Sequence, residues 1–225
     1  MTDLDLTKLD PEIREHLQKV ATPAHMAAYM TQQLPPDAKW LPFRHLMYVN
    51  ERLIEAITDD DERFVNVAIS VRAGKSELIS IYTALWYLGM YPDRQVVIVS
   101  YSEDKAKEWG GRTMALFQEF GKELFGLSVD SNNASKTAWS IAGHKGGLRA
   151  VGVNGALTGR AIDLGIIDDP IKNAEEANSE AARNAQWEWY TTTFRTRLMP
   201  GGTVLLTMAR WHEDDLTGRI QANTD

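Results

Sequence analysis

Three consecutive residues, Gly74, Lys75 and Ser76, have the types and the setting of a loop that binds phosphate groups. They follow residues 63–70, a mostly apolar run with several β-branched side chains that predicts a buried strand. An apolar helical run begins at Glu77. In such a strand–loop–helix unit, backbone N–H groups point at nucleotide phosphates, Lys75 adds positive charge and Ser76 offers a hydroxyl to Mg²⁺.

The loop departs from the full phosphate-loop pattern, G-x-x-x-x-G-K-S/T, because Ile69 occupies the position of the first glycine. A bare Gly-Lys-Ser triplet is common by chance, so a surface turn with an exposed lysine is the alternative. The strand before the triplet and the helix after it favour the phosphate loop, because the motif requires both.

A pair of carboxylates supplies the second half of the expected chemistry. Asp168 and Asp169 follow the apolar residues Leu164–Ile167, which predict a strand. In phosphate-loop enzymes the first such acid holds Mg²⁺, and an adjacent acid can orient and deprotonate the attacking water. Sites in parallel sheets lie at the carboxyl ends of strands, so both motifs are expected at one edge. A simple Asp-Asp-Pro turn ending at Pro170 is the alternative.

Four strands and the helices between them are expected to position these residues. The strands are predicted at residues 63–70, 95–100, 164–167 and 203–207. Because they alternate with helices, the fold class is α/β, a P-loop NTPase with a central, mostly parallel sheet flanked by helices.

The remaining segments complete this organisation. Residues 1–40 are predicted to form an N-terminal helical appendage, and residues 41–225 the P-loop ATPase domain. Helices are expected over about 44–57, from a Ser102 N-cap to about Phe120, over 174–198 as one long helix, and from near Asp214. A β-rich excursion is expected within 127–155, with strands around Ala138–Ile141 and Leu148–Val153.

Composition excludes several functional classes. The chain has 225 residues and no cysteine, which rules out a disulfide framework and a cysteine-based zinc site. Its net charge of −7 counts against a protein that coats DNA by itself, but not against a ring-shaped motor or a local basic patch. No apolar run is as long as a membrane span, and the N-terminus lacks a signal-peptide layout.

The order of the motifs resembles the ATPase domain of the large terminase subunit of tailed bacteriophages, the motor that packages DNA into a prohead. The similarity covers about residues 43–220. Its motifs are Phe43–His45, Arg72–Leu78, Ser100–Ser102, Leu157–Arg160, Ile166–Lys172, Thr207 and Arg210–Leu216. A degenerate first glycine is usual in that family.

The resemblance implies ATP and Mg²⁺ as cofactors. The nucleotide would be bound by Arg72, Ala73, Gly74, Lys75, Ser76 and Glu77. Ser76 and Asp168 would bind Mg²⁺, and Arg72 would contact or sense the γ-phosphate. Phe43 and His45 would border the adenine. For Arg72, an exposed loop arginine without such a role is the alternative.

Three further residues have roles that the resemblance implies. Asp169 occupies the place of a catalytic glutamate, and its shorter side chain reduces the reach to water by one methylene. Arg160 stands where related motors place an arginine finger, and a structural ion pair with Asp163 or Asp168 is the alternative. Thr207 falls in the motif that couples hydrolysis to movement; the alternative is a hydroxyl that merely ends a strand.

The implied partners are double-stranded DNA, the portal protein, the small terminase subunit and further copies of the chain in a ring. The implied location is the host cytoplasm, at the portal vertex of the prohead, with no membrane. Large terminases continue into a nuclease domain, which is expected to be absent here, so no DNA cleavage is expected. A helicase-like or other DNA-dependent P-loop ATPase, a nucleotide-binding scaffold with little turnover and a small-molecule kinase are the alternative functions.

Overall fold

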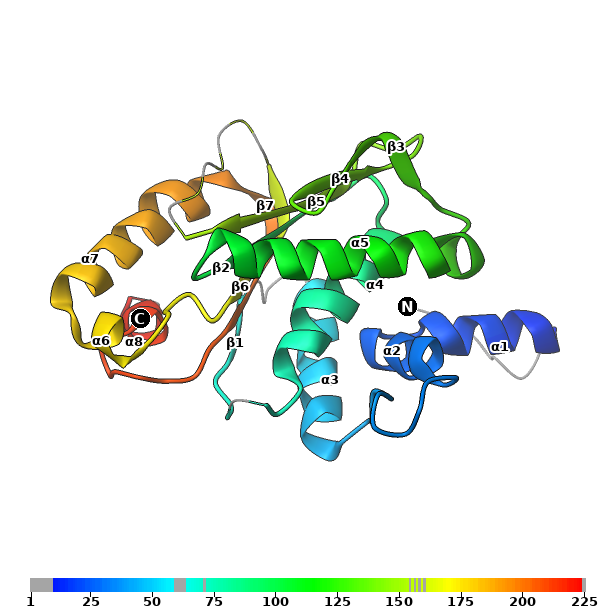
Figure 1. Cartoon of the computed structure of the whole chain (residues 1–225), viewed down its shortest axis with the longest axis horizontal. Helices are drawn as coiled ribbons and strands as arrows, with labels where there is room; N and C mark the ends of the chain where they lie inside the picture. The colour runs from blue at the N-terminus through cyan, green and yellow to red at the C-terminus, as the bar shows by residue number, and fades with distance from the viewer. Residues whose placement is uncertain are drawn as a thin grey trace.

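A computed structural model describes residues 10–58, 64–70, 72–153, 155, 157, 159 and 161–223. Seven strands form one sheet in the order β1-β7-β6-β2-β5-β4-β3 (Figure 1). The first five in that order run parallel: β1 (Phe64–Val67), β7 (Leu198–Thr207), β6 (Ile162–Asp168), β2 (Gln95–Ser100) and β5 (Gly147–Gly152). β4 (Ala138–Ile141) and β3 (Val129–Ser135) extend it in antiparallel fashion. The predicted α/β fold with a mostly parallel sheet is confirmed.

Helices cover both faces of the sheet. One face packs against α1 (Pro11–Val20), α2 (Pro23–Thr31), α3 (Arg44–Thr58), the π-helical segment η2 (Glu77–Thr83), α4 (Ala84–Met90) and α5 (Glu103–Phe125). The other face packs against α6 (Ala174–Asn178), α7 (Glu180–Glu188), the π-helical segment η3 (Trp189–Phe194) and α8 (Leu216–Ala222); the short 3₁₀ turn η4 (Arg195–Arg197) follows η3. Within the described residues, no helix is long and apolar enough to cross a membrane.

Side chains that alternate between the two faces of the sheet form two hydrophobic cores, one on each face. Ile98 and Ile166 lie in the core on the α5 side, whereas Val99 and Ile167 lie in the core on the η3 side. Successive side chains of a strand point to opposite faces, so a near-continuous apolar sequence serves both. This explains why the predicted strands lacked a polar face.

The strand ends meet at one edge of the sheet. In the parallel registers, Ser100 pairs with Asp168, Asp168 with Thr207, and Thr207 with Val67. β7, the last strand in the sequence, lies between β1 and β6. The carboxyl end of β7 therefore separates the phosphate loop from the acidic pair.

The predicted long helix over 174–198 is wrong. The chain leaves the helical conformation at Ser179, where φ is −78° and ψ is 115°. The Ser179 hydroxyl accepts a hydrogen bond from Ala182 N and starts α7, while Asn173 caps α6 in the same way. Each cap starts a helix because its side-chain oxygen satisfies a free N–H group of the first turn.

The segment 127–155 belongs partly to the main sheet. Its predicted strands are present as β4 and β5, but β5 pairs in parallel with β2 and is a core strand. Only β3 and β4 form the antiparallel extension, in which β3 stands at the edge. The long helix before it, α5, begins at the predicted Ser102 cap and continues past Phe120 to Phe125, where Gly126 adopts a left-handed φ of 70°.

Candidate nucleotide-binding site

The phosphate loop joins β1 to the helix that begins at Lys75 and continues as η2. It lies at the lower side of the molecule in Figure 1. Arg72 and Gly74 have positive φ angles of 61° and 80°, which give the loop its tight curl. A Cβ on Gly74 would lie 3.0 Å from Leu46 of α3, so glycine also permits the close approach of that helix.

Lys75 lies at the centre of the site. Its side chain is buried, and Nζ lies 3.2 Å from Oδ1 of Asp169. Arg72, Gly74, Ser76 and Glu77 join these two residues around a cavity of about 300 Å³. The cavity is thus lined by both predicted motifs, which are far apart in the sequence.

Ser76 and Asp168 form the second contact between the motifs. The Ser76 hydroxyl donates a hydrogen bond of 2.8 Å to Oδ1 of Asp168. The pKa of Asp168 is raised to about 6, chiefly by burial and also by the neighbouring negative charge of Asp169, while Ser76 and Lys75 oppose the rise. The carboxyl is therefore placed where a cation would favour its ionised form.

These two residues fit a Mg²⁺ ion by their chemistry. Both offer oxygen atoms, which Mg²⁺ prefers, and Mg²⁺ commonly takes one or two protein ligands together with substrate phosphates and water. Among the described residues, no cluster of three or more His, Cys, Asp or Glu side chains could hold a metal alone. Two oxygen ligands from the protein are the number that Mg²⁺ takes when nucleotide phosphates and water supply the others.

Asp169 is fixed by the chain on both sides. Its φ of 43° is left-handed. Its N–H donates to the carbonyl of Thr207 at 2.8 Å, and its Oδ1 accepts from the N–H of Ala209 at 3.1 Å. The segment that follows β7 therefore holds the second acid directly, a role for the Ala209 backbone that no side-chain motif indicates.

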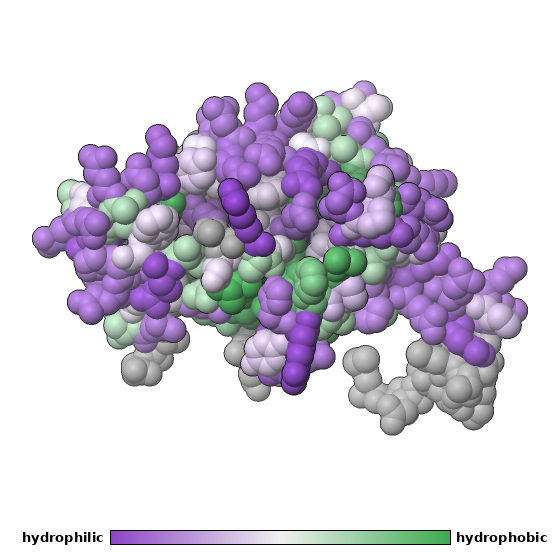
Figure 2. Space-filling model, turned by 60° about the horizontal axis from the view of Figure 1, so that its bottom comes forward, coloured by the Kyte–Doolittle hydropathy of each residue, from purple (hydrophilic) through white to green (hydrophobic). Residues whose placement is uncertain are grey.

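His45 lies next to the phosphate loop, and the ring of Phe43 packs against it. Their rings stack with centroids 6.0 Å apart and an interplanar angle of 9°. His45 Nε2 lies 3.0 Å from the carbonyl oxygen of Ala73, and the Phe43 side chain is exposed. Figure 2 brings this side of the molecule forward and shows a hydrophobic patch bordered by hydrophilic residues. An exposed aromatic surface beside a phosphate loop suits a purine base.

The family model described as "Terminase large subunit, T4likevirus-type, N-terminal" matches residues 66–224. The chain belongs to the large terminase subunit family. Its fold is similar to that of the HK97 bacteriophage large terminase, with a TM-score of 0.57 and 13% identity over 87% of this chain and 40% of that one. Two structures of the Thermus phage P74-26 large terminase ATPase domain, one of them a mutant, have TM-scores of 0.53 and 0.50 with 18% and 17% identity, covering 75% of this chain and 65% of theirs.

No curated protein matches the chain. The chain spans less than two thirds of the length of these terminase structures. Its sheet and flanking helices are those of the P-loop NTPase fold that terminase ATPase domains share.

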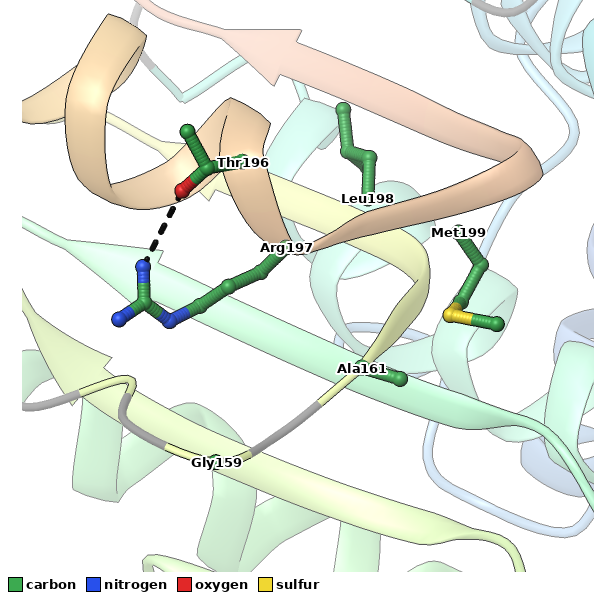
Figure 3. Close-up of a pocket in the computed structure, with 6 residues that line it drawn as sticks. All are labelled: Gly159, Ala161, Thr196, Arg197, Leu198 and Met199. Carbon is green, nitrogen blue, oxygen red and sulfur yellow. Dashed lines mark hydrogen bonds between the residues drawn. The ribbon is translucent and has the colours of Figure 1, made fainter.

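One predicted site residue of this terminase domain, Arg160, lies outside the described residues. Its neighbours Gly159 and Ala161 line a cavity of about 470 Å³ with Arg197 and the start of β7 (Figure 3). That cavity lies at the amino ends of β6 and β7, whereas Asp168 ends β6. Arg197 Nε donates a hydrogen bond of 2.6 Å to the carbonyl oxygen of Leu157.

Asp163, an alternative partner for Arg160, is already engaged. Its Oδ1 accepts from Arg94 and its Oδ2 from the N–H of Gln95, each at 2.7 Å. Thr207 is fully buried at the carboxyl end of β7, and within the described residues its hydroxyl has no hydrogen-bond partner. It lies beside Asp168 in the register of β6 and β7.

Two residues beside Asp168 have no role that the sequence motifs predict. Ser100 belongs to the motif Ser100–Ser102, and its buried side chain lies next to Asp168. Trp109 of α5 approaches the same carboxyl. Its only sequence signal is its place seven residues after the Ser102 cap, on the helix face that also carries Ala106 and Thr113, both buried.

Proposed function

We propose that this domain hydrolyses ATP to drive translocation of double-stranded viral DNA into a prohead. The supporting observation is the meeting of Lys75, Ser76, Asp168 and Asp169 at one edge of the sheet, in contacts of 2.8 and 3.2 Å between the two motifs. Membership of the large terminase family supports the packaging role. Packaging itself belongs to the whole motor, of which this chain is the nucleotide-binding part.

The bound state assigns each residue a task. Lys75 exchanges its ion pair with Asp169 for the β- and γ-phosphates, and the loop N–H groups bind the same oxygens. Ser76 and Asp168 hold Mg²⁺, which neutralises charge on the phosphates. Asp169, released from Lys75, orients the attacking water and accepts its proton. Phe43 and His45 border the adenine.

Arginine side chains complete the proposed site. Arg72 is exposed at the rim of the cavity and contacts the γ-phosphate. Arg160 acts as a finger on the phosphates of a neighbouring subunit, because a planar guanidinium matches two phosphate oxygens. Thr207 transmits the state of Asp168 to the segment after β7. The motor works as a ring of this chain on the portal protein, with the small terminase subunit, in the host cytoplasm.

The test is steady-state ATP hydrolysis with and without double-stranded DNA. The parent domain should turn over ATP, and DNA should change the rate. Lys75→Ala should abolish turnover because it removes the charge that faces the phosphates. Lys122→Ala, which removes an exposed lysine in the last turn of α5, should keep the parent rate. Parent-like turnover by Lys75→Ala would contradict the proposal.

A further inference from the structure

Three buried polar atoms without partners surround the Asp168 carboxyl. Within the described residues, Ser100 Oγ, Thr207 Oγ1 and Trp109 Nε1 make no hydrogen bond. An unsatisfied buried donor or acceptor costs about 1–3 kcal/mol, and most such groups in folded proteins are paired. Three of them around one functional carboxyl therefore indicate a purpose other than stability.

The sheet register brings two of these atoms to Asp168. Ser100 is its register partner on β2, and Thr207 is its register partner on β7. Paired residues of neighbouring parallel strands point to the same face, and such strands lie about 4.8 Å apart. Both hydroxyls are therefore adjacent to the carboxyl on the face that α5 covers.

The third atom is held over Asp168 by α5. The Trp109 ring lies beneath Lys105 Nζ, 4.1 Å from the ring centroid, with the Arg112 guanidinium 5.5 Å away. Arg112 also forms an ion pair of 2.6 Å with Glu77, the residue after Ser76. The indole is thus tied to the helix that carries the phosphate loop.

The Asp168 carboxyl accepts a hydrogen bond from Ser76 at one oxygen, Oδ1, at 2.8 Å. Among hydrogen bonds between described residues, this is the one that reaches the carboxyl. The Trp109 N–H is near enough to lower the pKa of this carboxyl, yet it lacks the geometry of a formed hydrogen bond.

We infer that Ser100 and Trp109 are positioning residues for Mg²⁺ binding: their O–H and N–H groups donate to the Asp168 carboxylate and hold it in the orientation that the cation requires. Mg²⁺ demands near-ideal octahedral geometry, and carboxylate ligands are commonly oriented by outer hydrogen-bond partners. This inference rests on the proposed function, because it assumes that Asp168 serves a Mg²⁺–nucleotide complex.

The test compares ADP binding by calorimetry in Mg²⁺ and in EDTA, for Ser100→Ala and for Trp109→Phe. Each variant should lose about 10-fold of the affinity that Mg²⁺ adds, while its affinity in EDTA stays that of the parent. The matched control is Trp139→Phe, which removes a buried, unpartnered indole N–H from β4. This control should keep the parent's response to Mg²⁺.

The outcomes separate the two proposals. A parent domain that does not bind ADP, or binds it without help from Mg²⁺, contradicts the proposed function itself. A parent that responds to Mg²⁺ together with variants that respond equally overturns the positioning role. Equal loss of affinity in Mg²⁺ and in EDTA also overturns it, because that pattern indicates general damage, which thermal unfolding of each variant would register.

Discussion

Asp169 shows how a single residue can be fixed by its surroundings. A non-glycine residue with positive φ stores about 1–3 kcal/mol of strain and persists only where neighbouring contacts hold it. Here the contacts are the Thr207 carbonyl, the Ala209 N–H and the Lys75 ammonium. The carboxylate is therefore aimed into the nucleotide cavity by the backbone, which offsets the shorter reach of aspartate compared with glutamate.

Asp169→Asn should keep nucleotide binding while slowing hydrolysis by about 10²–10⁴-fold, because the amide fills the same space but cannot accept a proton from water. Nucleotide affinity by calorimetry and the single-turnover rate would separate binding from chemistry. Asp169→Glu, which introduces the residue usual in the family, should retain the hydrolysis that Asp169→Asn loses. Parallel loss of Mg²⁺-dependent binding and turnover would instead assign Asp169 to the metal.

Asp168 should make the domain's stability depend on pH. Its pKa of about 6 in the folded protein exceeds the ordinary 3.8, so the native state binds the proton more tightly than the unfolded state. The stabilisation from this group is full below about pH 4 and is lost as pH rises through 6. Asp168→Asn should therefore be more stable than the parent at pH 8, by up to about 3 kcal/mol, with the difference vanishing near pH 4. Urea unfolding across this range measures it.

Asp214 provides a control of opposite sign. Hydrogen bonds from Arg219 and Arg183 hold the pKa of Asp214 below its ordinary value. The contribution of Asp214 to the free energy of unfolding is present at neutral pH and is lost as the pH falls through the acid range. Asp214→Asn should therefore destabilise the domain at pH 8, and this deficit should shrink at low pH. The same direction of change for both variants would contradict the assignment of charges.

The sequence was informative about residues wherever a motif and a topological rule acted together. Lys75, Ser76, Asp168 and Asp169 could be predicted to meet because parallel strands bring their carboxyl ends to one edge. Trp109 could not, because its approach to Asp168 depends on how α5 crosses the sheet. No spacing along the chain encodes that crossing.

Among the elements, α5 packs closely against β5 and against the hairpin formed by β3 and β4. A Cβ on Gly110 would lie 2.4 Å from the Lys136 carbonyl oxygen and 2.9 Å from Ala150, so only glycine fits between helix and sheet. Gly111, one residue on, faces only the flexible side chain of Lys136 at 3.2 Å. The packing that sets Trp109 over Asp168 thus depends on one of two adjacent glycines.

Gly110→Ala should lower the free energy of unfolding by about 2 kcal/mol or more, because the helix must move away from the hairpin. Gly111→Ala should be neutral or should stabilise by up to about 1 kcal/mol, because alanine favours the helical conformation and the lysine can move. Denaturant unfolding of both variants checks the contrast. Equal effects from the two substitutions would mean that the helix is not in close contact at Gly110.

Elements were predictable where caps and apolar runs coincide. β2 and the Ser102 cap of α5 follow such signals. The break between α6 and α7 was missed because apolar and aromatic residues continue past Ser179 at helical spacing, and the cap signal of Ser179 was outweighed. β3 was missed because its side chains are mostly exposed and polar. Its sequence therefore lacks the alternation of apolar and polar residues that predicts a strand.

At the scale of the whole molecule, Ala161 and the acidic pair lie at opposite ends of β6. Strand β6 separates Ala161 from Asp168 by seven residues, or about 20 Å at the usual rise of a strand. Asp163, one alternative partner, is occupied by Arg94 and Gln95. The role proposed for Arg160 towards another subunit is the one that a direct experiment must decide.

Mixing two inactive variants tests this role. Arg160→Ala keeps its own nucleotide site but lacks the finger, and Lys75→Ala keeps the finger but lacks the site. Each should be strongly impaired alone, since fingers contribute about 10³–10⁵-fold in rate. Under conditions that assemble the ring, the mixture should regain part of the ATPase activity. Absence of recovery in confirmed mixed rings would indicate that Arg160 serves its own subunit.

The position of β7 between β1 and β6 has a consequence for the nascent chain. β1 carries the phosphate loop, and among the described strands it pairs with β7 alone, so Phe64 gains its register partner Val204 only once β7 has been made. While ribosomes are still synthesising the intervening residues, β2, β5 and β6 can already assemble, but the loop has no strand to support it. Nucleotide can therefore stabilise the fold as a ligand only after β7 has emerged, so the candidate nucleotide site matures late during translation.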